Sequence, residues 1–271
     1  MFSVLISIYY KEKPQYFNRA MKSIWDEQTV KPNEIILVLD GPLTNELYSV
    51  IHEWQDKIGE LFKTIPLDKN VGLGNALNIG MNHCNYELIA RMDTDDISAY
   101  NRFESQLKVF DENDVDACSA FISEFDNDEN QIVSHRKLPE LHHDIVKYSK
   151  FRSPLNHAVT MYKKSIVEKS GGYKHMLWME DYYLWVRMIM NGAKLYNIQD
   201  TLLNVRAGSD LLQRRGGSSY VKSEVTFLNE IKKIGYITTL EYMINILIKA
   251  PVRLLPKIFL KAAYRWLRSY H

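Results

Sequence analysis

The sequence predicts an α/β protein with a mainly parallel sheet and helices on both faces, and three observations support this. Short apolar runs alternate with segments whose apolar residues recur at helical spacing. Several runs are nearly continuous, which is typical of strands buried on both faces. The chain has 271 residues, 46% hydrophobic and 25% charged, which is enough to bury a sizeable core.

The first hundred residues predict repeated strand–helix units. Apolar runs indicate strands over residues 4–9, 34–40, 62–67 and 86–93. Helical spacing indicates helices over residues 14–25, 44–58 and about 75–84. Pro14 opens the first helix, where a first turn tolerates proline. Ligands of such sheets bind outside the carboxyl ends of the strands, so this region suggests a nucleotide-binding sheet.

The second half is less regular. Two expected strands, 117–125 and 131–138, are joined by the polar turn DNDEN, which suggests an antiparallel pair. Helices are expected over 101–112, 141–150, 179–191 and about 218–235. We also expect strands at 158–162 and within 195–206. A turn is expected at 171–173 and a polar loop at 208–219.

The stretch YELIARMDTDDI, residues 86–97, carries the clearest chemical signal. A buried strand leads into three carboxylates, Asp93, Asp95 and Asp96. Carboxylates this close repel one another unless a cation lies between them, and Mg²⁺ and Mn²⁺ take oxygen ligands. The alternative is a solvated turn that caps the next helix. Asp40 ends another expected strand and so lies on the same rim, which favours a ligand site.

Two further segments have both a structural and a functional interpretation. Asn70, Gly72 and Gly74 precede a helix, where backbone N–H groups can bind phosphate or ribose, or where the glycines simply serve the turn. Glu180 and Asp181 stand in the first turn of the 179–191 helix, where the helix dipole by itself favours carboxylates.

Composition bounds the cellular context. Two cysteines, Cys84 and Cys118, argue against a disulfide scaffold and fit a reducing compartment. The N-terminal apolar run is short and has no basic residues before it, and no run approaches 18 apolar residues, so we expect a cytoplasmic protein without a membrane span. The balance of 34 Lys+Arg against 33 Asp+Glu gives no attraction to nucleic acid.

The charge is nevertheless uneven along the chain. Six basic residues and no acidic one follow Glu241, which leaves 28 basic against 33 acidic residues before them. They recur in steps of four and then three among aromatic and aliphatic residues, and Pro251 and Pro256 should kink or break the helix. We interpret residues 238–271 as basic amphipathic helices that meet an anionic membrane surface through 249–268. The alternative is a helix packed on the body with a solvated basic face.

The order of the motifs resembles glycosyltransferase family 2, the inverting, metal-dependent transferases of the GT-A fold. The motifs are VLISIYY at the start, LVLDG at 37–41, NVGLGNALNIG at 70–80, ARMDTDD at 90–96, SPLNHAVTMYKKS at 153–165, GGY at 171–173 and MEDYYLWVRM at 179–188. The resemblance covers about residues 2–210. It implies a Rossmann-like mixed sheet over residues 1–237, with a nucleotide-sugar-binding half at 1–100 and an acceptor half at 101–237.

The resemblance also implies roles on the donor side. The implied donor-binding residues are Asp40, Asn70, Gly72, Arg91 and Asp93. Asp93 and Asp95 match the D-x-D pair that holds Mn²⁺ or Mg²⁺, with Asp95 the direct ligand. Asp96 is similar to a third acidic position of less uniform role. In this chemistry the metal neutralises the leaving diphosphate.

On the acceptor side, Asp181 resembles the catalytic base that takes the proton of the attacking hydroxyl. The implied acceptor residues are Glu180, His157 and Trp178. A structural histidine is an equal alternative for His157. Arg206, Arg214 and Arg215 lie where related enzymes place a loop over the donor diphosphate.

The implied reaction moves one hexose, galactose or glucose, from a UDP-sugar to a lipid-linked saccharide such as GlcNAc-diphospho-undecaprenol. This places the protein in O-antigen or polysaccharide synthesis, peripheral on the inner face of the plasma membrane. The Q-x-x-R-W pattern of processive enzymes is absent from residues 213–216, so a single addition is expected. The alternatives are a dTDP-rhamnose-type transferase, a non-catalytic nucleotide-sugar-binding protein and a sugar nucleotidyltransferase, whose glycine-rich basic loop is missing after the first strand.

Overall fold

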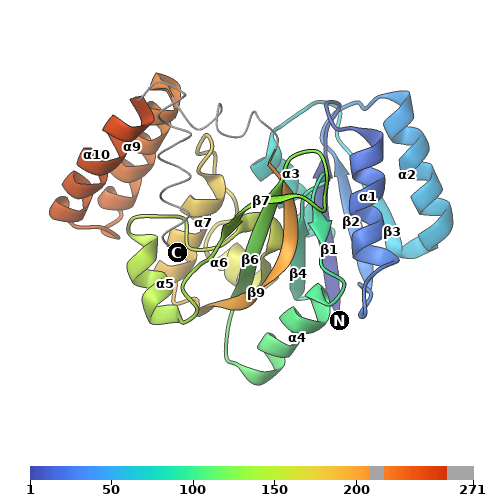
Figure 1. Cartoon of the computed structure of the whole chain (residues 1–271), viewed down its shortest axis with the longest axis horizontal. Helices are drawn as coiled ribbons and strands as arrows, with labels where there is room; N and C mark the ends of the chain where they lie inside the picture. The colour runs from blue at the N-terminus through green and yellow to red at the C-terminus, as the bar shows by residue number, and fades with distance from the viewer. Residues whose placement is uncertain (208–216, 255–271) are drawn as a thin grey trace.

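The protein is a layered α/β structure built on one sheet (Figure 1). The structure, a computed structural model, describes residues 1–207 and 217–254. Within these residues a nine-stranded sheet has the order β3-β2-β1-β4-β8-β6-β9-β5, and β7 pairs with β6. The expected α/β class with helices on both faces is confirmed.

The first half is the parallel part of the sheet. Its strands are β1 (Phe2–Ile8), β2 (Glu34–Leu39), β3 (Phe62–Pro66) and β4 (Leu88–Met92). All three pairings among them are parallel, so their carboxyl ends form one rim. Helices α1 (Pro14–Trp25) and α2 (Asn45–Ile58, followed by the 3-10 turn Gly59–Leu61) cover one face, and α3 (Leu73–Asn82) covers the other.

The second half continues the sheet with mixed directions. Its strands are β5 (Ile97–Ser98), β6 (Ala117–Phe125), β7 (Ile132–Arg136), β8 (Met161–Lys163) and β9 (Leu195–Arg206). The predicted antiparallel pair is β6–β7, whereas β6 and β9 run parallel. The helices are α4 (Arg102–Glu112), α5 (His142–Ser149), α6 (Lys164–Lys169) and α7 (Glu180–Met190). Trp185 of α7 is fully buried in the same core as α3, and Phe103 of α4 lies in the core on the opposite face.

The strand expected over 158–162 is wrong in its first part. A 3-10 turn, His157–Val159, comes first and β8 begins at Met161. The cause is the buried Asn156. Its side-chain Nδ2 donates to the Ala120 carbonyl at 2.7 Å, and its main-chain carbonyl accepts from the Thr160 hydroxyl at 2.8 Å. These bonds hold the chain in a turn that apolar periodicity does not reveal.

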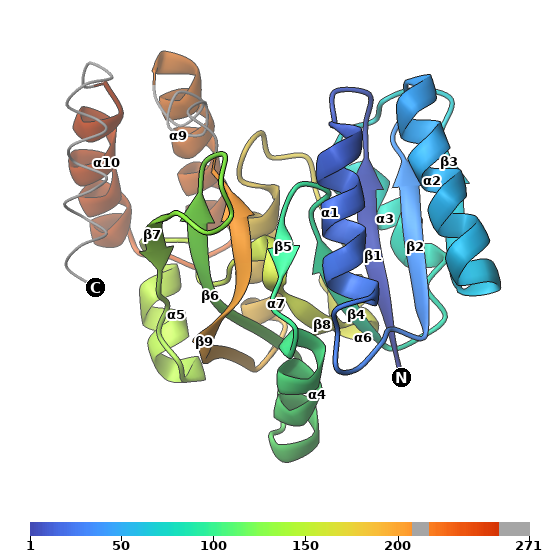
Figure 2. The same cartoon turned by 45° about the vertical axis from the view of Figure 1, so that its right-hand side comes forward.

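Two helices close the described chain, α9 (Ser218–Lys233) and α10 (Thr239–Leu254). They pack side by side at the end of the molecule opposite α2 (Figures 1 and 2). The helix continues through Pro251, which differs from the expected break, and Pro256 lies outside the described residues. Lys249, the first of the basic residues, pairs with Glu224 of α9 at 3.4 Å. No helix of the described chain is both long and apolar enough to cross a bilayer.

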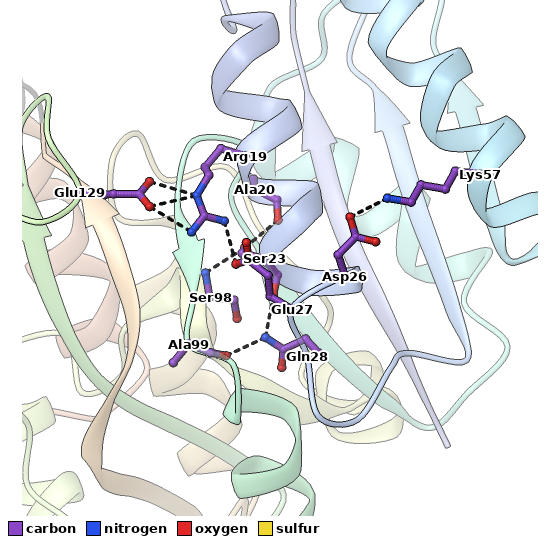
Figure 3. A network of polar contacts seen from close by, with 10 residues as sticks. All are labelled: Arg19, Ala20, Ser23, Asp26, Glu27, Gln28, Lys57, Ser98, Ala99 and Glu129. Atoms are coloured by element: carbon purple, nitrogen blue, oxygen red, sulfur yellow. Dashed lines mark hydrogen bonds and ion pairs between the residues drawn. The ribbon is translucent and has the colours of Figure 1, made fainter.

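A polar network ties the two halves together (Figure 3). Arg19 of α1 donates from Nε to the Glu129 carboxylate, in the β6–β7 turn, at 3.0 Å, and also pairs with Glu27 at 2.9 Å. Beneath it, the Ser98 amide of β5 donates to the Ser23 hydroxyl at 3.0 Å, and Gln28 bridges to the Ala99 carbonyl. The bonds to Glu129, Ser98 and Ala99 join residues far apart in sequence, so they fix α1 and the turn after it against β5 and the β6–β7 turn.

Candidate active site

The end of β2 is an aspartate whose carboxylate is already bound by backbone. Asp40 accepts hydrogen bonds from the amides of Val71 at 2.7 Å and Gly72 at 3.2 Å, and its carbonyl accepts from the Asn70 side chain at 3.2 Å. Gly41 has a φ of +89°, and a Cβ there would stand 2.7 Å from the Asn70 nitrogen. The structure therefore brings together three of the predicted donor residues, Asp40, Asn70 and Gly72, and uses the Asp40 carboxylate to hold the entry to α3.

The start of α3 faces the start of α7. A Cβ on Gly74 would lie 3.3 Å from the Cβ of Tyr173 and 3.7 Å from the Cγ of Glu180, so a side chain there would require Tyr173 to shift by a few tenths of an ångström. Asn78 fixes the Gly171–Tyr173 turn from the same helix, since its Nδ2 donates to the Tyr173 carbonyl and its Oδ1 accepts from the Tyr173 amide, both at 2.8 Å. The glycine motif thus joins the donor half to the predicted acceptor residues.

Two buried arginines lie under the end of β4. Arg91 is fully buried, and its guanidinium donates to the Asp93 carboxylate and to the Met92 carbonyl. Arg102 of α4 is also fully buried and donates to the Arg91 carbonyl at 2.5 Å. Burial lowers the pKa of Arg102 to about 9. Arg91, predicted to bind the donor, is buried and donates to the Asp93 carboxylate, so it holds a second predicted donor residue in place.

The three aspartates after β4 lie in different surroundings. Burial alone would raise the pKa of Asp93, but the Arg91 guanidinium holds the net value below its usual range. Burial and the neighbouring Asp93 and Glu12 raise the pKa of Asp95 to about 7. Burial, together with Asp95 and Asp93, raises the pKa of Asp96 well above its usual value, although Asp96 accepts the Arg206 amide at 2.9 Å. Burial and mutual repulsion therefore disfavour the ionised forms of Asp95 and Asp96, which a bound cation would favour.

Glu12 is a member of this cluster that the sequence did not reveal. It follows β1, and its carboxylate accepts a hydrogen bond from the hydroxyl of Thr94, the middle residue of the D-x-D triplet. More than 80 residues separate the two in sequence. The parallel pairing of β1 with β4 brings their ends together.

The residues present fit a divalent cation. Asp95 is partly exposed, and among the described residues no lysine or arginine forms an ion pair with it. Carboxylate oxygens that raise one another's pKa values are the hard ligands that Mn²⁺ and Mg²⁺ bind. In residues 1–207 and 217–254 no three acidic, histidine or cysteine side chains are arranged as a complete ligand set. A cation here would therefore take its other ligands from substrate and water.

Arg206, predicted for the diphosphate loop, lies beside Asp95. Its Nε donates to the Asp95 carbonyl at 3.3 Å, and its guanidinium stands 3.8 Å from the ring centre of Tyr16 and 4.6 Å from that of Phe125. The rings fix the position of this cation at the edge of the carboxylate cluster. Arg214 and Arg215, predicted for the same loop, lie outside the described residues.

His157 lies between the two halves of the site. Its Nε2 is 2.9 Å from the Tyr173 hydroxyl, and its ring packs against Trp185 at 6.0 Å between centres. Burial and the nearby Arg91 lower the pKa of His157 to about 4, even though Asp181 and Asp93 act in the opposite direction. The imidazole is therefore neutral at pH 7 and can act as a hydrogen-bonding group but not as a cation.

Glu180 and Asp181 occupy the first turn of α7, as predicted. Both are partly exposed. Burial and the adjacent Asp181 raise the pKa of Glu180. Asp181 and Asp93 both act to raise the pKa of His157, so the predicted base and one member of the predicted metal pair lie near the same histidine.

Trp178 is an exposed tryptophan with strained backbone. Its φ is +63°, in the left-handed region that bulky side chains avoid, and 41% of its surface is exposed. Its ring stacks on Tyr220 of α9 at 5.4 Å between centres and 22° between planes. The sequence does not indicate a role for Tyr220, because no local motif contains it. An exposed ring held next to Glu180 offers an apolar face to a sugar.

Two exposed tyrosines follow β1 at the same rim. Tyr9 is 40% and Tyr10 53% exposed, and their rings meet edge to face at 5.9 Å. The strand predicted over residues 4–9 includes Tyr9, whereas β1 ends at Ile8. Aromatic rings at a sheet rim are surfaces on which a nucleobase can stack.

Comparison with known proteins agrees with this geometry. The model of the family described as "Glycosyl transferase family 2" matches residues 3–171. The chain is 39% identical over 265 residues to the Escherichia coli protein UDP-Gal:alpha-D-GlcNAc-diphosphoundecaprenol beta-1,3-galactosyltransferase, covering 97% of this chain and 95% of that protein. It is 38% identical over 260 residues to the amylovoran biosynthesis glycosyltransferase AmsE of Erwinia amylovora, covering 94% and 95%.

A solved structure shows the same fold. The mannosyltransferase PcManGT of Pyrobaculum calidifontis, in complex with GDP-Man and Mn²⁺, superposes with a TM-score of 0.65 at 15% identity, over 98% of this chain and 79% of that one. The motifs, the arrangement of the rim and the family match lead to one identification. The chain belongs to glycosyltransferase family 2 and has the GT-A fold that its motifs imply.

Proposed function

We propose that this protein is an inverting, metal-dependent galactosyltransferase that moves one galactose from UDP-galactose to GlcNAc-diphospho-undecaprenol. The observation that carries the proposal is the match over nearly the whole of both chains to an E. coli enzyme whose name states this donor and acceptor. AmsE, named for amylovoran biosynthesis, supports a role in polysaccharide assembly. UDP-glucose and dTDP-rhamnose are the competing donors.

The donor half would hold the nucleotide and its diphosphate. Asp93 and Asp95 are the residues to hold Mn²⁺ or Mg²⁺, and a bound ion would supply a Lewis acid that neutralises the leaving diphosphate. Arg91 holds Asp93 in place from below, and Arg206 adds a fixed positive charge beside Asp95. Tyr9 or Tyr10 would stack on the uracil, while Asn70 and the amides near Gly72 would lie along the ribose. Asp40 would fix that loop.

The acceptor half would supply the proton transfer. Asp181 would take the proton of the attacking hydroxyl on the face opposite the leaving group, so that the configuration at the anomeric carbon inverts. Neutral His157, which lies near both Asp181 and Asp93, would hydrogen-bond a sugar hydroxyl. Trp178 would stack on the acceptor sugar, with Glu180 beside it. Because the proposed base and the proposed diphosphate site lie on different halves of the molecule, the hydroxyl could attack from the side opposite the leaving group in a single step.

The acceptor's lipid would place the protein peripherally on the inner face of the plasma membrane. The segment 249–268 would contribute basic residues to that contact, and we propose that the appendage begins at residue 238, directly before α10. Lys249 already has a partner in Glu224, so the later basic residues would carry this role.

The decisive experiment is a donor screen with a GlcNAc-diphospho-lipid acceptor, with and without Mn²⁺. We expect transfer from UDP-galactose, release of UDP, loss of activity with EDTA and a β-linked product by NMR. Transfer from UDP-glucose or dTDP-rhamnose instead would replace the donor assignment. Pyrophosphate release from a nucleoside triphosphate, or donor binding without any turnover, would contradict the proposal.

A further inference from the structure

The outer face of α10 is apolar and uncovered in the described chain. Leu240 is 70%, Met243 48%, Leu247 67% and Ile248 61% exposed. Positions three, four, seven and eight apart lie on one side of a helix, so these four side chains form a single strip. We call them the α10 strip.

The polarity of α10 is the reverse of that of an ordinary surface helix. Two of its charged residues, Glu241 and Lys249, form ion pairs with the rest of the molecule: Glu241 pairs with Lys150 at 2.6 Å and Lys249 with Glu224 at 3.4 Å. Asn245 is buried and donates to the Lys150 carbonyl at 3.0 Å. Among the described side chains of this helix, the exposed ones are Thr239, the α10 strip and Pro251. A surface helix normally buries its apolar stripe and exposes its charges.

The strip is held rigidly to the acceptor side of the site. Helix α10 packs beside α9 (Figure 2) and also contacts Lys150 at the end of α5; the two helices share a core through Phe227, Leu228 and Ile231 with Ile246. Phe227 also contacts Tyr182 of α7 at 4.3 Å between ring centres, and Tyr220 of α9 carries the stacked Trp178. Whatever binds the strip is therefore positioned relative to Asp181.

We propose that the α10 strip inserts into the surface of a lipid bilayer, lying in its plane. The strip is aliphatic and offers no hydrogen-bonding group, which suits hydrocarbon. From Leu240 to Pro251 the helix is about 16 Å long, far short of the roughly 30 Å of a bilayer core, so it lies along the interface. The chain beyond it, residues 255–271, contains Lys257, Lys261, Arg265 and Arg268 and no acidic residue, which complements an anionic surface.

This inference rests on the proposed function in one respect, that the acceptor is anchored in a membrane. It adds a separate surface, since the α10 strip acts through aliphatic insertion and not through the basic residues of 249–268. An enzyme that docks in this way would hold the acceptor side of its site at a fixed height above the bilayer.

The test is vesicle co-sedimentation of the full chain with two matched double variants. Leu247→Gln/Ile248→Gln removes half of the strip, and Ile132→Gln/Val133→Gln replaces two exposed residues of β7 that are 40% and 58% exposed. With phosphatidylcholine vesicles containing phosphatidylglycerol, we expect the α10 variant to bind at least about tenfold more weakly and the β7 variant to bind like the wild type. Pure phosphatidylcholine vesicles should show the same difference at lower affinity.

Three outcomes would overturn the inference. Equal vesicle binding by all three proteins would remove it directly. A concentration-dependent dimer of the wild type that the α10 variant loses, measured by sedimentation velocity, would assign the strip to a second copy. A lower Tm of the α10 variant with unchanged vesicle binding would assign the strip to residues 255–271. Transfer to a short-chain, water-soluble acceptor, measured in parallel, should be equal in all three proteins, and its absence from the wild type would instead contradict the proposed function.

Discussion

The two strands that flank β1 both end at aspartates, and these aspartates are used differently. At the end of β2, the Asp40 carboxylate is saturated by the Val71 and Gly72 amides. At the end of β4, Asp95 lies among Asp93 and Glu12, and together with burial they raise its pKa to about 7. A carboxylate that accepts backbone hydrogen bonds stabilises the fold. A carboxylate close to other carboxylates is repelled by them, and a bound cation removes that repulsion.

The largest effect is expected for Asp95→Ala. Losing this ligand should lower transfer by about 10⁴-fold, because neutralising a leaving diphosphate contributes several kcal/mol. The melting temperature without metal should stay the same or rise, since the change removes a crowded charge. Initial rates with saturating Mn²⁺ and thermal melts of the same preparations measure both. A fully active variant would show that the β4 carboxylates are a mere acidic turn.

Asp181→Asn extends the comparison to a third carboxylate, one at a helix start. We expect a loss of between about 10² and 10⁴ in kcat, because the base is removed while the shape is kept. Donor binding, measured by titration calorimetry with UDP, should be unchanged. A parallel loss of donor affinity would mean that Asp181 belongs to the donor side, and unchanged kcat would remove it as the base.

The affinity for Mn²⁺ should depend on pH near the pKa of Asp95, about 7. Its pKa in the folded, metal-free protein, about 7, lies above the unfolded value of roughly 4. Without metal, the stability from this group is therefore present below pH 4 and lost as the pH rises through 7. Since metal binds the deprotonated form, Mn²⁺ affinity should rise about tenfold from pH 6 to pH 8. Manganese-induced shifts in Tm measure this, with Asp95→Ala as the control, and a shift equal at both pH values would refute it.

The smallest effect is expected for Asp40→Asn, and it concerns stability. An amide can accept one of the two backbone hydrogen bonds but turns a donor toward the other, which should cost about 1–2 kcal/mol. Melting should fall by roughly 2–8 °C for a chain of this size. Donor KM is measured alongside. A higher KM with an unchanged Tm would show that Asp40 contacts the donor directly, as its family position implies.

The spacing of apolar residues predicted an element correctly where the interactions that form it lie within one segment of the chain. Helix α1 was expected over 14–25 and is found at Pro14–Trp25, because Pro14 and the spacing of Phe17, Ala20 and Ile24 act within one helix. The failure at Asn156 has the opposite cause, since the Ala120 carbonyl that binds its side chain lies on β6, 36 residues away. Short elements such as α6 and β5 carry too few residues for a periodic signal and were missed.

The sequence by itself determined the α/β class, the family, and the order in which carboxylates follow buried strands, because hydrophobic period and strand ends are local properties. The tertiary structure decided which of those carboxylates lies close to other carboxylates and which accepts backbone hydrogen bonds. Strand pairing brought Glu12 to the D-x-D triplet, and the packing of α3 on β2 bound Asp40 to backbone amides. In α10, Glu241 and Lys249 form ion pairs with Lys150 and Glu224 of the body, and an apolar strip of the helix is left exposed. Each of these depends on contacts across long sequence separations, which composition and periodicity do not encode.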